Sequence, residues 1–504
     1  MRLFPMSSGR ARVRLVQAGA VIAAAALIAG CGNAYRPVVT PINPSGPASQ
    51  PTSYAVVVSA PSPTTAGIVT IIDYAGDTVM ALAPIGPGPS AFVMDQLGAT
   101  GYTVDSDGTL ANFPITTSLQ AKMVTYSTLS AAAQPVNLMA PSAGLWAADL
   151  NGNVADVFSS SPQAFRLAIP VAPTPVTIIG SPTLQGQREY AISQNFTDPT
   201  GLTCNNSPTT APAGAATPIE LSTNTADAPI ALGICPVYAV PSPDQRRVYV
   251  MNRGDDTVSV INSQNNIRNS CTPFLNQNGQ PVTCHPTLPL STTAVTATGI
   301  TPPNGTSGMP VHAGPVYAEY NSALNQLVVA DYDGGTISII DVTLDPYGND
   351  GPTFGTTFTI PVGNNPASVT VLADGTRAYS ANQTDGTVTI ANLTSHTVEK
   401  TLAVVGHPRT VASTQNSLYG KVYVASPDSP YLTILATLTD LVDTTVLVEG
   451  NIVDVRVTTQ NGSNGNSNIV SRSAGHGEPC NLPPALMVST YGANYTLKQC
   501  QTIP

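Results

Sequence analysis

The feature that most constrains this chain is a repeat of about 44 residues that runs through most of its length. A short strand-like segment with an aromatic residue at its third position recurs eight times, and seven of the eight positions are aromatic. These positions are Tyr54, Tyr102, Trp146, Tyr190, Tyr249, Val328, Tyr379 and Tyr423. A fixed period of about 20–50 residues is typical of architectures in which each repeat is one supersecondary unit.

Each repeat continues with the same landmarks. A polar residue usually stands three positions after the aromatic one, and a turn rich in Gly or Asp leads into a second, β-branched strand. A third, less regular strand follows, and a Pro, such as Pro315 or Pro366, introduces a fourth. Asp-Gly and Asn-Gly steps suit hairpin turns that need positive φ. Four short strands per repeat predict an all-β fold, a β-propeller of four-stranded blades.

The number of units sets the size of the ring. Eight units can be counted over residues 52–458, so we expect seven or eight blades. The last unit departs from the pattern because Ile452 stands where other units have Pro. Insertions at 196–217 and 262–312 interrupt the fourth and fifth units. We expect them to form long loops on one face, where they serve binding or merely decorate the ring.

Composition excludes several other classes of protein. The 504 residues include 46 Pro and 41 Gly, which argues against a coiled coil or a helical array. A hydrophobic content of 42% with only 10% charged residues argues against intrinsic disorder. No basic cluster is present and the net charge is negative, so nucleic acid is not an expected partner.

Residues 1–30 have the form of a secretory signal peptide. Four Arg residues precede an Ala-rich apolar stretch, Val16 to Ala29, that is too short for a membrane span. The stretch ends in Leu27–Cys31 (LIAGC), which resembles the lipobox of bacterial lipoproteins. The resemblance implies that Cys31 is lipidated and becomes the mature N-terminus; an ordinary cleavage site is the alternative. Gly32, rather than Asp, implies outer-membrane sorting if the host is Gram-negative.

The two ends of the chain differ from the repeats between them. Residues 31–51 hold the candidate lipidated Cys and a Pro-rich tether; at ~3.1 Å per residue this tether could reach roughly 60 Å. Residues 459–504 read as a flexible linker followed by a disulfide-stapled tail. We therefore expect an exported protein, anchored by lipid to the membrane of the bacterial cell envelope. Without residues 1–30 it has 15 basic and 29 acidic side chains.

Six cysteines remain after Cys31, an even number that suits an exported protein with disulfides. They are Cys204, Cys235, Cys271, Cys284, Cys480 and Cys500. Sequence proximity favours the pairs 204–235, 271–284 and 480–500, among 15 possible connectivities. No Cys-x-x-Cys pair exists and the five His are scattered, so neither a metal site nor a cofactor is predicted.

The best-preserved units resemble the YVTN-type β-propeller repeat. The resemblance is carried by Tyr249–Asn252 with Gly254–Ile261, by Tyr379–Asn382 with Gly386–Ile390, and by the Gly-x-x-Pro step at Gly363–Pro366, shortened at Gly406–Pro408. It covers residues 52–458 and is weaker in the first four units. Members of this family mostly have seven blades. The resemblance implies that the Pro-initiated strands line the axial channel.

Polar residues on or just before these strands are the candidate site. Glu319 lies within the fifth such strand, His407 and Arg409 flank Pro408, and His312 lies slightly upstream of Pro315. A carboxylate, a His and an Arg around one channel mouth could bind an anionic or sugar-like ligand or transfer protons. Hydrogen bonding between neighbouring blades is the structural alternative.

Two functions from different classes follow. The first is a non-catalytic scaffold that binds an envelope protein, a glycan or a small molecule. The second is a hydrolase resembling lactonase-type propellers, with its site at the channel mouth. The absence of a recognisable catalytic motif favours the first. Clustering of His312, Glu319, His407 and Arg409 would favour the second, and burial of Glu319 against a neighbouring blade would argue against it.

Overall fold

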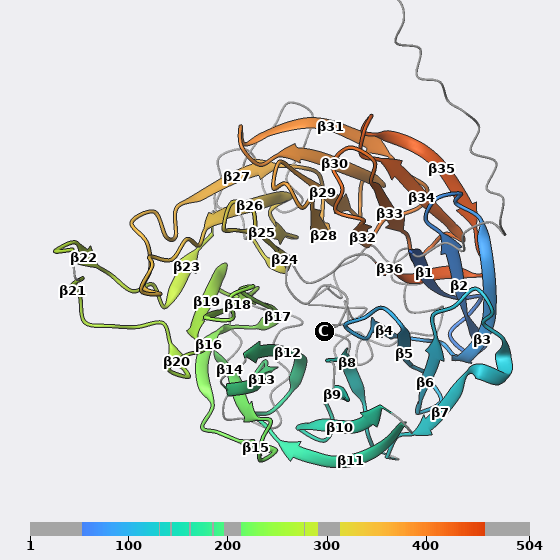
Figure 1. Ribbon diagram of the computed structural model, residues 1–504, viewed down its shortest axis with the longest axis horizontal. Helices are drawn as coiled ribbons and strands as arrows, with labels where there is room; N and C mark the ends of the chain where they lie inside the picture. Colours follow the sequence, from blue (N-terminus) through green and yellow to red (C-terminus); the bar gives the residue numbers. More distant parts are fainter. Residues whose placement is uncertain are drawn as a thin grey trace, which may run out of the picture. The chain divides into compact units, whose positions relative to one another are not determined.

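Eight antiparallel sheets stand around a central axis in the computed structural model (Figure 1). The structure describes residues 53–458 except 131, 142–143, 161–162, 184–185, 196–212, 277 and 291–312. Each sheet is one blade, and consecutive blades follow one another around the ring. The only helical element in the described residues is the one-turn 3₁₀ helix η1 (Ala121–Met123).

The first four blades contain the following strands, from the axis outward. Blade 1 has β36 (Asn451–Val457), β1 (Tyr54–Ala60), β2 (Ala66–Asp73) and β3 (Val79–Pro87). Blade 2 has β4 (Ala91–Met94), β5 (Thr100–Val104), β6 (Thr109–Pro114) and β7 (Thr125–Thr128). Blade 3 has β8 (Pro135–Met139), β9 (Leu145–Asp149), β10 (Val154–Ser160) and β11 (Gln163–Pro170). Blade 4 has β12 (Pro175–Thr183), β13 (Gly186–Ser193) and β14 (Ala213–Glu220), with β15 (Thr225–Ala226) and β16 (Ile230–Ile234) outermost.

The other four blades follow the same order. Blade 5 has β17 (Pro236–Pro241), β18 (Arg247–Asn252) and β19 (Thr257–Asn262), with β20 (Ile267–Arg268) and β23 (Thr287–Pro289) outermost. Blade 6 has β24 (Pro315–Asn321), β25 (Gln326–Asp331), β26 (Thr336–Asp341) and β27 (Thr357–Pro361). Blade 7 has β28 (Pro366–Val371), β29 (Arg377–Asn382), β30 (Thr387–Asn392) and β31 (Thr397–Ala403). Blade 8 has β32 (Thr410–Ser413), β33 (Lys421–Ala425), β34 (Tyr431–Ala436) and β35 (Leu441–Leu447).

The prediction of a β-propeller is confirmed, and the ring has eight blades rather than seven. The Pro-initiated strands are innermost in blades 3 to 7, as expected. The irregular last unit closes the ring: β36 pairs antiparallel with β1, from Ala55 opposite Val457 to Ala60 opposite Asn451. Blade 1 is therefore built from both ends of the described chain.

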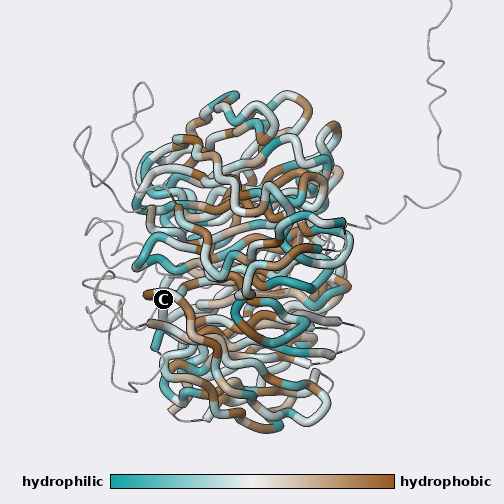
Figure 2. The backbone as a smooth tube through the Cα atoms, turned by 90° about the vertical axis from the view of Figure 1, so that its left-hand side faces the viewer, coloured by the Kyte–Doolittle hydropathy of each residue, from teal (hydrophilic) through white to brown (hydrophobic). Residues whose placement is uncertain are grey.

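Strand direction gives the ring two different faces. The face that carries the turns from second to third strand and the connections between blades is named the insertion face, and the opposite one the terminal face. Innermost strands run from the insertion face to the terminal face. The terminal face carries the remaining turns and both ends of the described chain, Tyr54 and Thr458, whose backbone N–H and Oγ1 are 2.8 Å apart. Figure 2 shows the ring edge-on, with hydrophobic and hydrophilic residues alternating along its strands.

The insertions differ from the expected boundaries. Residues 213–217 belong to β14, so residues 194–212 separate the second and third strands of blade 4. Within 262–312, β20 and β23 pair with two parts of β19 and together supply the fourth strand of blade 5. Between them the hairpin of β21 (Phe274–Leu275) and β22 (Pro281–Val282) projects from the outer edge (Figure 1). By connectivity, 196–212 and 291–312 both leave the ring on the insertion face.

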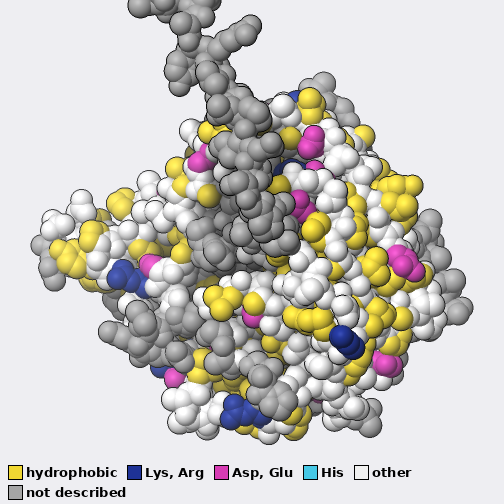
Figure 3. Space-filling view, turned by 45° about the vertical axis from the view of Figure 1, so that its right-hand side comes forward, with side chains coloured by type: hydrophobic (Ala, Val, Ile, Leu, Met, Phe, Trp, Pro, Cys, Tyr) yellow, Lys and Arg dark blue, Asp and Glu magenta, His cyan; other side chains and the backbone are white. Residues whose placement is uncertain are grey.

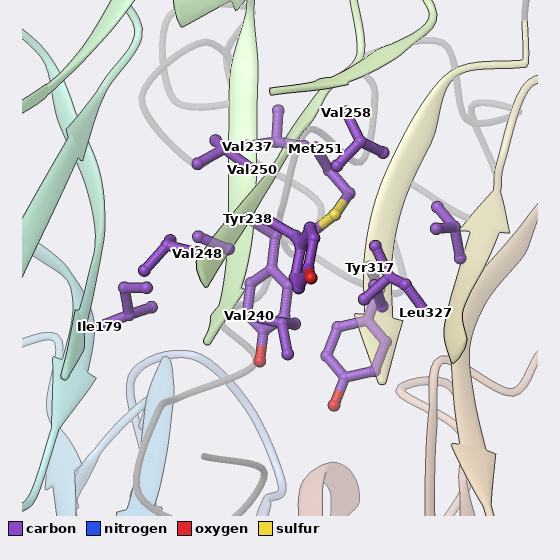
Figure 4. Close-up of a cluster of buried hydrophobic side chains, with 14 of the residues drawn as sticks. Ile179, Val237, Tyr238, Val240, Val248, Val250, Met251, Val258, Tyr317 and Leu327 are labelled. Carbon is purple, nitrogen blue, oxygen red and sulfur yellow. The ribbon is translucent and has the colours of Figure 1, made fainter. Parts of the chain in front are cut away.

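The recurring aromatic residues fill the space between blades. The side chains of Tyr190, Tyr249, Tyr379 and Tyr423 are fully buried. The innermost strands add a second layer of such contacts: Tyr238 of β17 stacks on Tyr317 of β24, with ring centroids 4.7 Å apart (Figure 4). Each blade thus presents apolar side chains to both neighbours, which is how a repeat that cannot bury its own core becomes stable.

The polar residue at the end of each second strand ties three segments together. The Asn382 side chain donates hydrogen bonds to Thr387 Oγ1 at 3.0 Å and to Thr389 Oγ1 at 2.8 Å, both on the third strand. It also lies against the Gly of the Gly-x-x-Pro step, because a Cβ on Gly363 would be 2.7 Å from Asn382 Cγ. These landmarks of the repeat are therefore parts of one packing unit, which explains their fixed spacing.

Blade 6 carries Asp331 where blade 7 carries Asn382. Asp331 is fully buried, and its Oδ2 accepts hydrogen bonds from Thr336 at 3.0 Å and Ser338 at 2.6 Å. Burial raises its pKa to about 8, against these hydrogen bonds. The unfolded chain loses this proton near pH 4 while the native state keeps it, so Asp331 costs stability increasingly from about pH 4 to about pH 8.

We predict that Asp331→Asn raises the free energy of unfolding at pH 8 by about 1–3 kcal/mol, the usual cost of a badly solvated buried polar group. The gain should be much smaller at pH 4, where the unfolded state also holds this proton to a large extent. Urea unfolding at the two pH values measures it. Asn382→Asp is the matched control and should destabilise more at pH 8 than at pH 4. A change in stability on Asp331→Asn that does not vary with pH would contradict a raised pKa of Asp331.

Candidate functional site

The structure places Glu319 near the terminal end of the axial channel, inside the protein. Its side chain is buried, and Oε2 accepts a hydrogen bond of 2.6 Å from the backbone N–H of Val371 on the neighbouring innermost strand, β28. The other edge of β28 pairs with β29, so Glu319 supplies a hydrogen-bond acceptor to the edge of β28 that faces the axis. This is the burial against a neighbouring blade that argues against a catalytic carboxylate.

Arg409 and His407 lie at the opposite, insertion end of the channel, just before β32. Arg409 is buried and donates from Nη2 to Val453 O of β36 at 2.7 Å. His407 is partly exposed; its backbone N–H and Nδ1 both contact Asp428 of the same blade. His312 lies outside the described residues. The structure therefore does not bring Glu319 together with His407 and Arg409, since they occupy opposite ends of two blades separated by blade 7.

Polar side chains join consecutive innermost strands in the same way elsewhere in the ring. Asn137 Oδ1 of β8 accepts from the Ile178 N–H of β12 at 3.0 Å. Ser368 of β28 donates to Arg409 O at 2.8 Å and accepts from the Val411 N–H of β32 at 3.2 Å. The polar lining of the channel is thus used largely to pair strand edges that have no sheet neighbour.

The insertion face carries a second recurring network, made by carboxylates. Asp255, Asp385 and Asp428, each in a turn from second to third strand, accept a hydrogen bond from the backbone N–H 21 residues earlier, just before the innermost strand. Between blades 5 and 6, Arg253 makes a buried bidentate ion pair with Asp333, at 2.9 and 2.8 Å. These contacts hold the connections between blades and give this face a rigid rim.

Asp156 and Glu189 are among the buried carboxyl groups that the sequence analysis did not identify. Asp156 stands seven residues after Asp149, where other blades have Ser or Thr; burial and the charge of Asp149 raise the pKa of Asp156 to about 7. Glu189 of β13 is fully buried beside Gly180, and burial raises its pKa well above the ordinary value. The seven-residue spacing could have identified Asp156, whereas no sequence signal identified Glu189.

One of the three expected disulfides is present in the described residues. Cys271 and Cys284 are bonded, with Cα atoms 5.5 Å apart, and close the base of the β21–β22 hairpin. Cys235 is also disulfide-bonded, but its expected partner Cys204 lies outside the described residues, as do Cys31, Cys480 and Cys500. The pairs 204–235 and 480–500 therefore remain predictions.

Neither a cluster of metal ligands nor a helix able to cross a membrane is found in the described part of the chain. No group of three or more His, Cys, Asp or Glu side chains there could hold a metal ion. No helix in the same residues has the length and hydropathy needed to cross a membrane.

Comparison with known proteins gives the fold alone. No family model and no curated protein matches the chain. Its structure is similar to that of apo AztD from Citrobacter koseri, with a TM-score of 0.52 and 13% identity over 80% of this chain and 97% of that one. It is also similar to the dihydro-heme d1 dehydrogenase NirN in complex with DHE, with a TM-score of 0.50 and 15% identity over 84% and 79% of the two chains. A Bacteroides fragilis protein described provisionally as a 6-phosphogluconolactonase has a TM-score of 0.48, too low to carry an argument, with 14% identity over 82% and 99%.

We predict that Glu319→Ala lowers the free energy of unfolding by about 1–3 kcal/mol, because the buried Val371 N–H loses its acceptor. Glu319→Gln keeps an acceptor oxygen and should cost less. Urea or thermal unfolding of the two variants measures the difference. Equal stability of wild type and Glu319→Ala would contradict this role and return Glu319 to the list of functional candidates.

Proposed function

We propose that this protein is an envelope-anchored lipoprotein whose β-propeller serves as a non-catalytic binding scaffold. The observation that carries the proposal is the use of the channel residues. Glu319 and Arg409 bind backbone groups of neighbouring blades, so these two side chains do not form an acid–base pair at one channel mouth. We therefore assign binding to the insertion face. Its rim is held by the carboxylate network, and the residues that flank 196–212 and 291–312 lie on it.

The lactonase-like alternative requires the four candidate residues in one place. Glu319 and Arg409 lie at opposite ends of the channel, and a buried carboxylate that already accepts from a backbone N–H is a poor general base. The similarity to enzymes of the same fold does not offset this, since one fold supports many functions. We therefore favour a scaffold whose partner is an envelope protein, a glycan or a small molecule.

Lipidation at Cys31 predicts the location of the protein. The wild type should incorporate radiolabelled palmitate in a Gram-negative host and fractionate with the outer membrane. Cys31→Ser should lose both the label and the membrane association, while Cys271→Ser, which leaves the lipobox intact, should keep the label. Recovery of unlabelled wild type in the soluble periplasmic fraction would contradict the anchor.

Binding through the insertion face can be tested with a photo-crosslinking amino acid in living cells. Positions Asp107 and Asn151 are exposed in turns on that face, and Asp374 and Ser395 are exposed in turns on the terminal face. We expect the same crosslinked partner from Asp107 and Asn151 and none from the two control positions. A product from the terminal face alone, or from both faces equally, would contradict the proposal.

A further inference from the structure

Large apolar side chains are unusually exposed on the terminal face at blades 8 and 2, on either side of blade 1. They are Leu97 of blade 2, exposed by 84%, and Leu418, Tyr419 and Leu438 of blade 8, exposed by 58%, 76% and 63%. We name these four residues the terminal apolar patch. Figure 3 shows the side of the ring that carries β1–β3 and β33–β35, where hydrophobic side chains outnumber charged ones on the described surface.

Three contacts run beside the patch: one within blade 8, one between blades 8 and 1, and one between blade 2 and Thr458 at the end of β36. Thr437 Oγ1, beside Leu438, donates to Asn416 O of the loop that carries Leu418 and Tyr419. Tyr74, in a turn of blade 1, donates from its hydroxyl to Tyr419 O. On the other side Gly98, next to Leu97, lies so close to Thr458 that an added Cβ would be 3.2 Å from the Thr458 side chain.

The fold does not require apolar residues at these positions. Leu97 occupies a turn in which the N–H of Gly98 donates to Asp95 O, and the matching turns of blades 5 and 7 hold Asp244 and Asp374 at the same place. Leu438 likewise matches Gln264 of blade 5 and Thr394 of blade 7. Blades 2 and 8 therefore depart from the polar pattern of their own repeat, which an exposed surface would otherwise favour.

Charged side chains beside blade 8 are neutralised in pairs, whereas Asp73 of blade 1 and Asp95 of blade 2 accept hydrogen bonds from backbone N–H groups. Lys421 pairs with Asp77 across blades 8 and 1, and Arg377 pairs with Asp440 at 2.6 Å. The chain as a whole is acidic, so anionic lipid would repel most of its surface. Pairing of these charges weakens that repulsion where the apolar side chains are exposed.

The described chain begins on this same face. β1 starts at Tyr54, within the stretch of contacts that joins Thr458, Gly98 and Leu97. A chain anchored at Cys31 would thus join the propeller beside the patch. Anchoring holds the ring at high effective concentration near the bilayer, so even weak insertion of a few side chains suffices to orient it.

We infer that the terminal apolar patch rests in the interfacial layer of the lipid bilayer to which the protein is anchored. Leu supplies apolar area, and Tyr suits a site with one apolar and one hydrated end. The inference rests on the proposed lipid anchor and extends the proposed function. With the terminal face against lipid, the insertion face points away from the membrane toward its partner.

The test uses the full-length acylated protein in vesicles of phosphatidylethanolamine and phosphatidylglycerol. An environment-sensitive fluorophore is attached, without reductant, to Leu97→Cys or to its matched control Asp374→Cys. We expect a severalfold rise and a blue shift of emission at position 97 on reconstitution, with little change at 374. Leu97→Asp combined with Leu438→Thr, the residues of the matching turns, should increase the cleavage of the tether by added protease.

The outcomes separate this inference from the anchor. Acylated protein that binds vesicles while position 97 stays in water would overturn the inference and leave the anchor standing. Protein without acyl chains that still binds vesicles and buries position 97 would support the patch and show that the anchor is not required for binding. A fluorophore that is already buried without vesicles would overturn the inference. If its emission then changes with protein concentration, a second copy of the chain covers the patch. If its emission does not change, another part of the same chain covers it.

Discussion

Closure of the ring by β36 is the interaction on which the rest of the structure depends. Six residue pairs join β36 to β1, and Ser59 adds a hydrogen bond of 2.7 Å to Glu449 O. The alternating residues of β1 then serve both neighbours: Ala55 and Val57 pack with blade 8, while Val56 and Val58 pack with blade 2. An open ring would expose two apolar sheet faces, so the pairing of one strand removes two unfavourable surfaces.

Repetition explains why the sequence predicted the architecture better than the arrangement of the site residues. The period, the aromatic residue and the Gly-x-x-Pro step all belong to a packing unit that recurs in each blade, so repetition makes them visible. The split fourth strand of blade 5 was hidden because β20 and β23 are each three residues or shorter and the Cys271–Cys284 hairpin separates them. Local patterns cannot show that two such fragments share one neighbour.

Glu319 and Arg409 are not brought together, for a related reason. Glu319 and Arg409 were grouped because both belong to strands expected to line the channel, but lining a channel does not fix the position along it. Arg409 directly precedes its strand and Glu319 is the fifth residue of β24, so strand direction alone places them at opposite ends. Glu189 could not be found at all, since only the three-dimensional pairing of β13 with Gly180 of β12 shows that it is buried.

The innermost strands impose a chemical limit on function in this ring. Each has one edge with no sheet partner, and buried backbone groups there need acceptors and donors that water cannot supply. Asn137, Glu319, Ser368 and Arg409 meet that need across consecutive blades. Polar side chains committed in this way cannot also bind a ligand without exposing a backbone group, which is why the proposed binding role is assigned to the faces. The two faces differ in their chemistry: one carries ordered carboxylate networks, and the other carries apolar side chains beside the point where the described chain enters the ring.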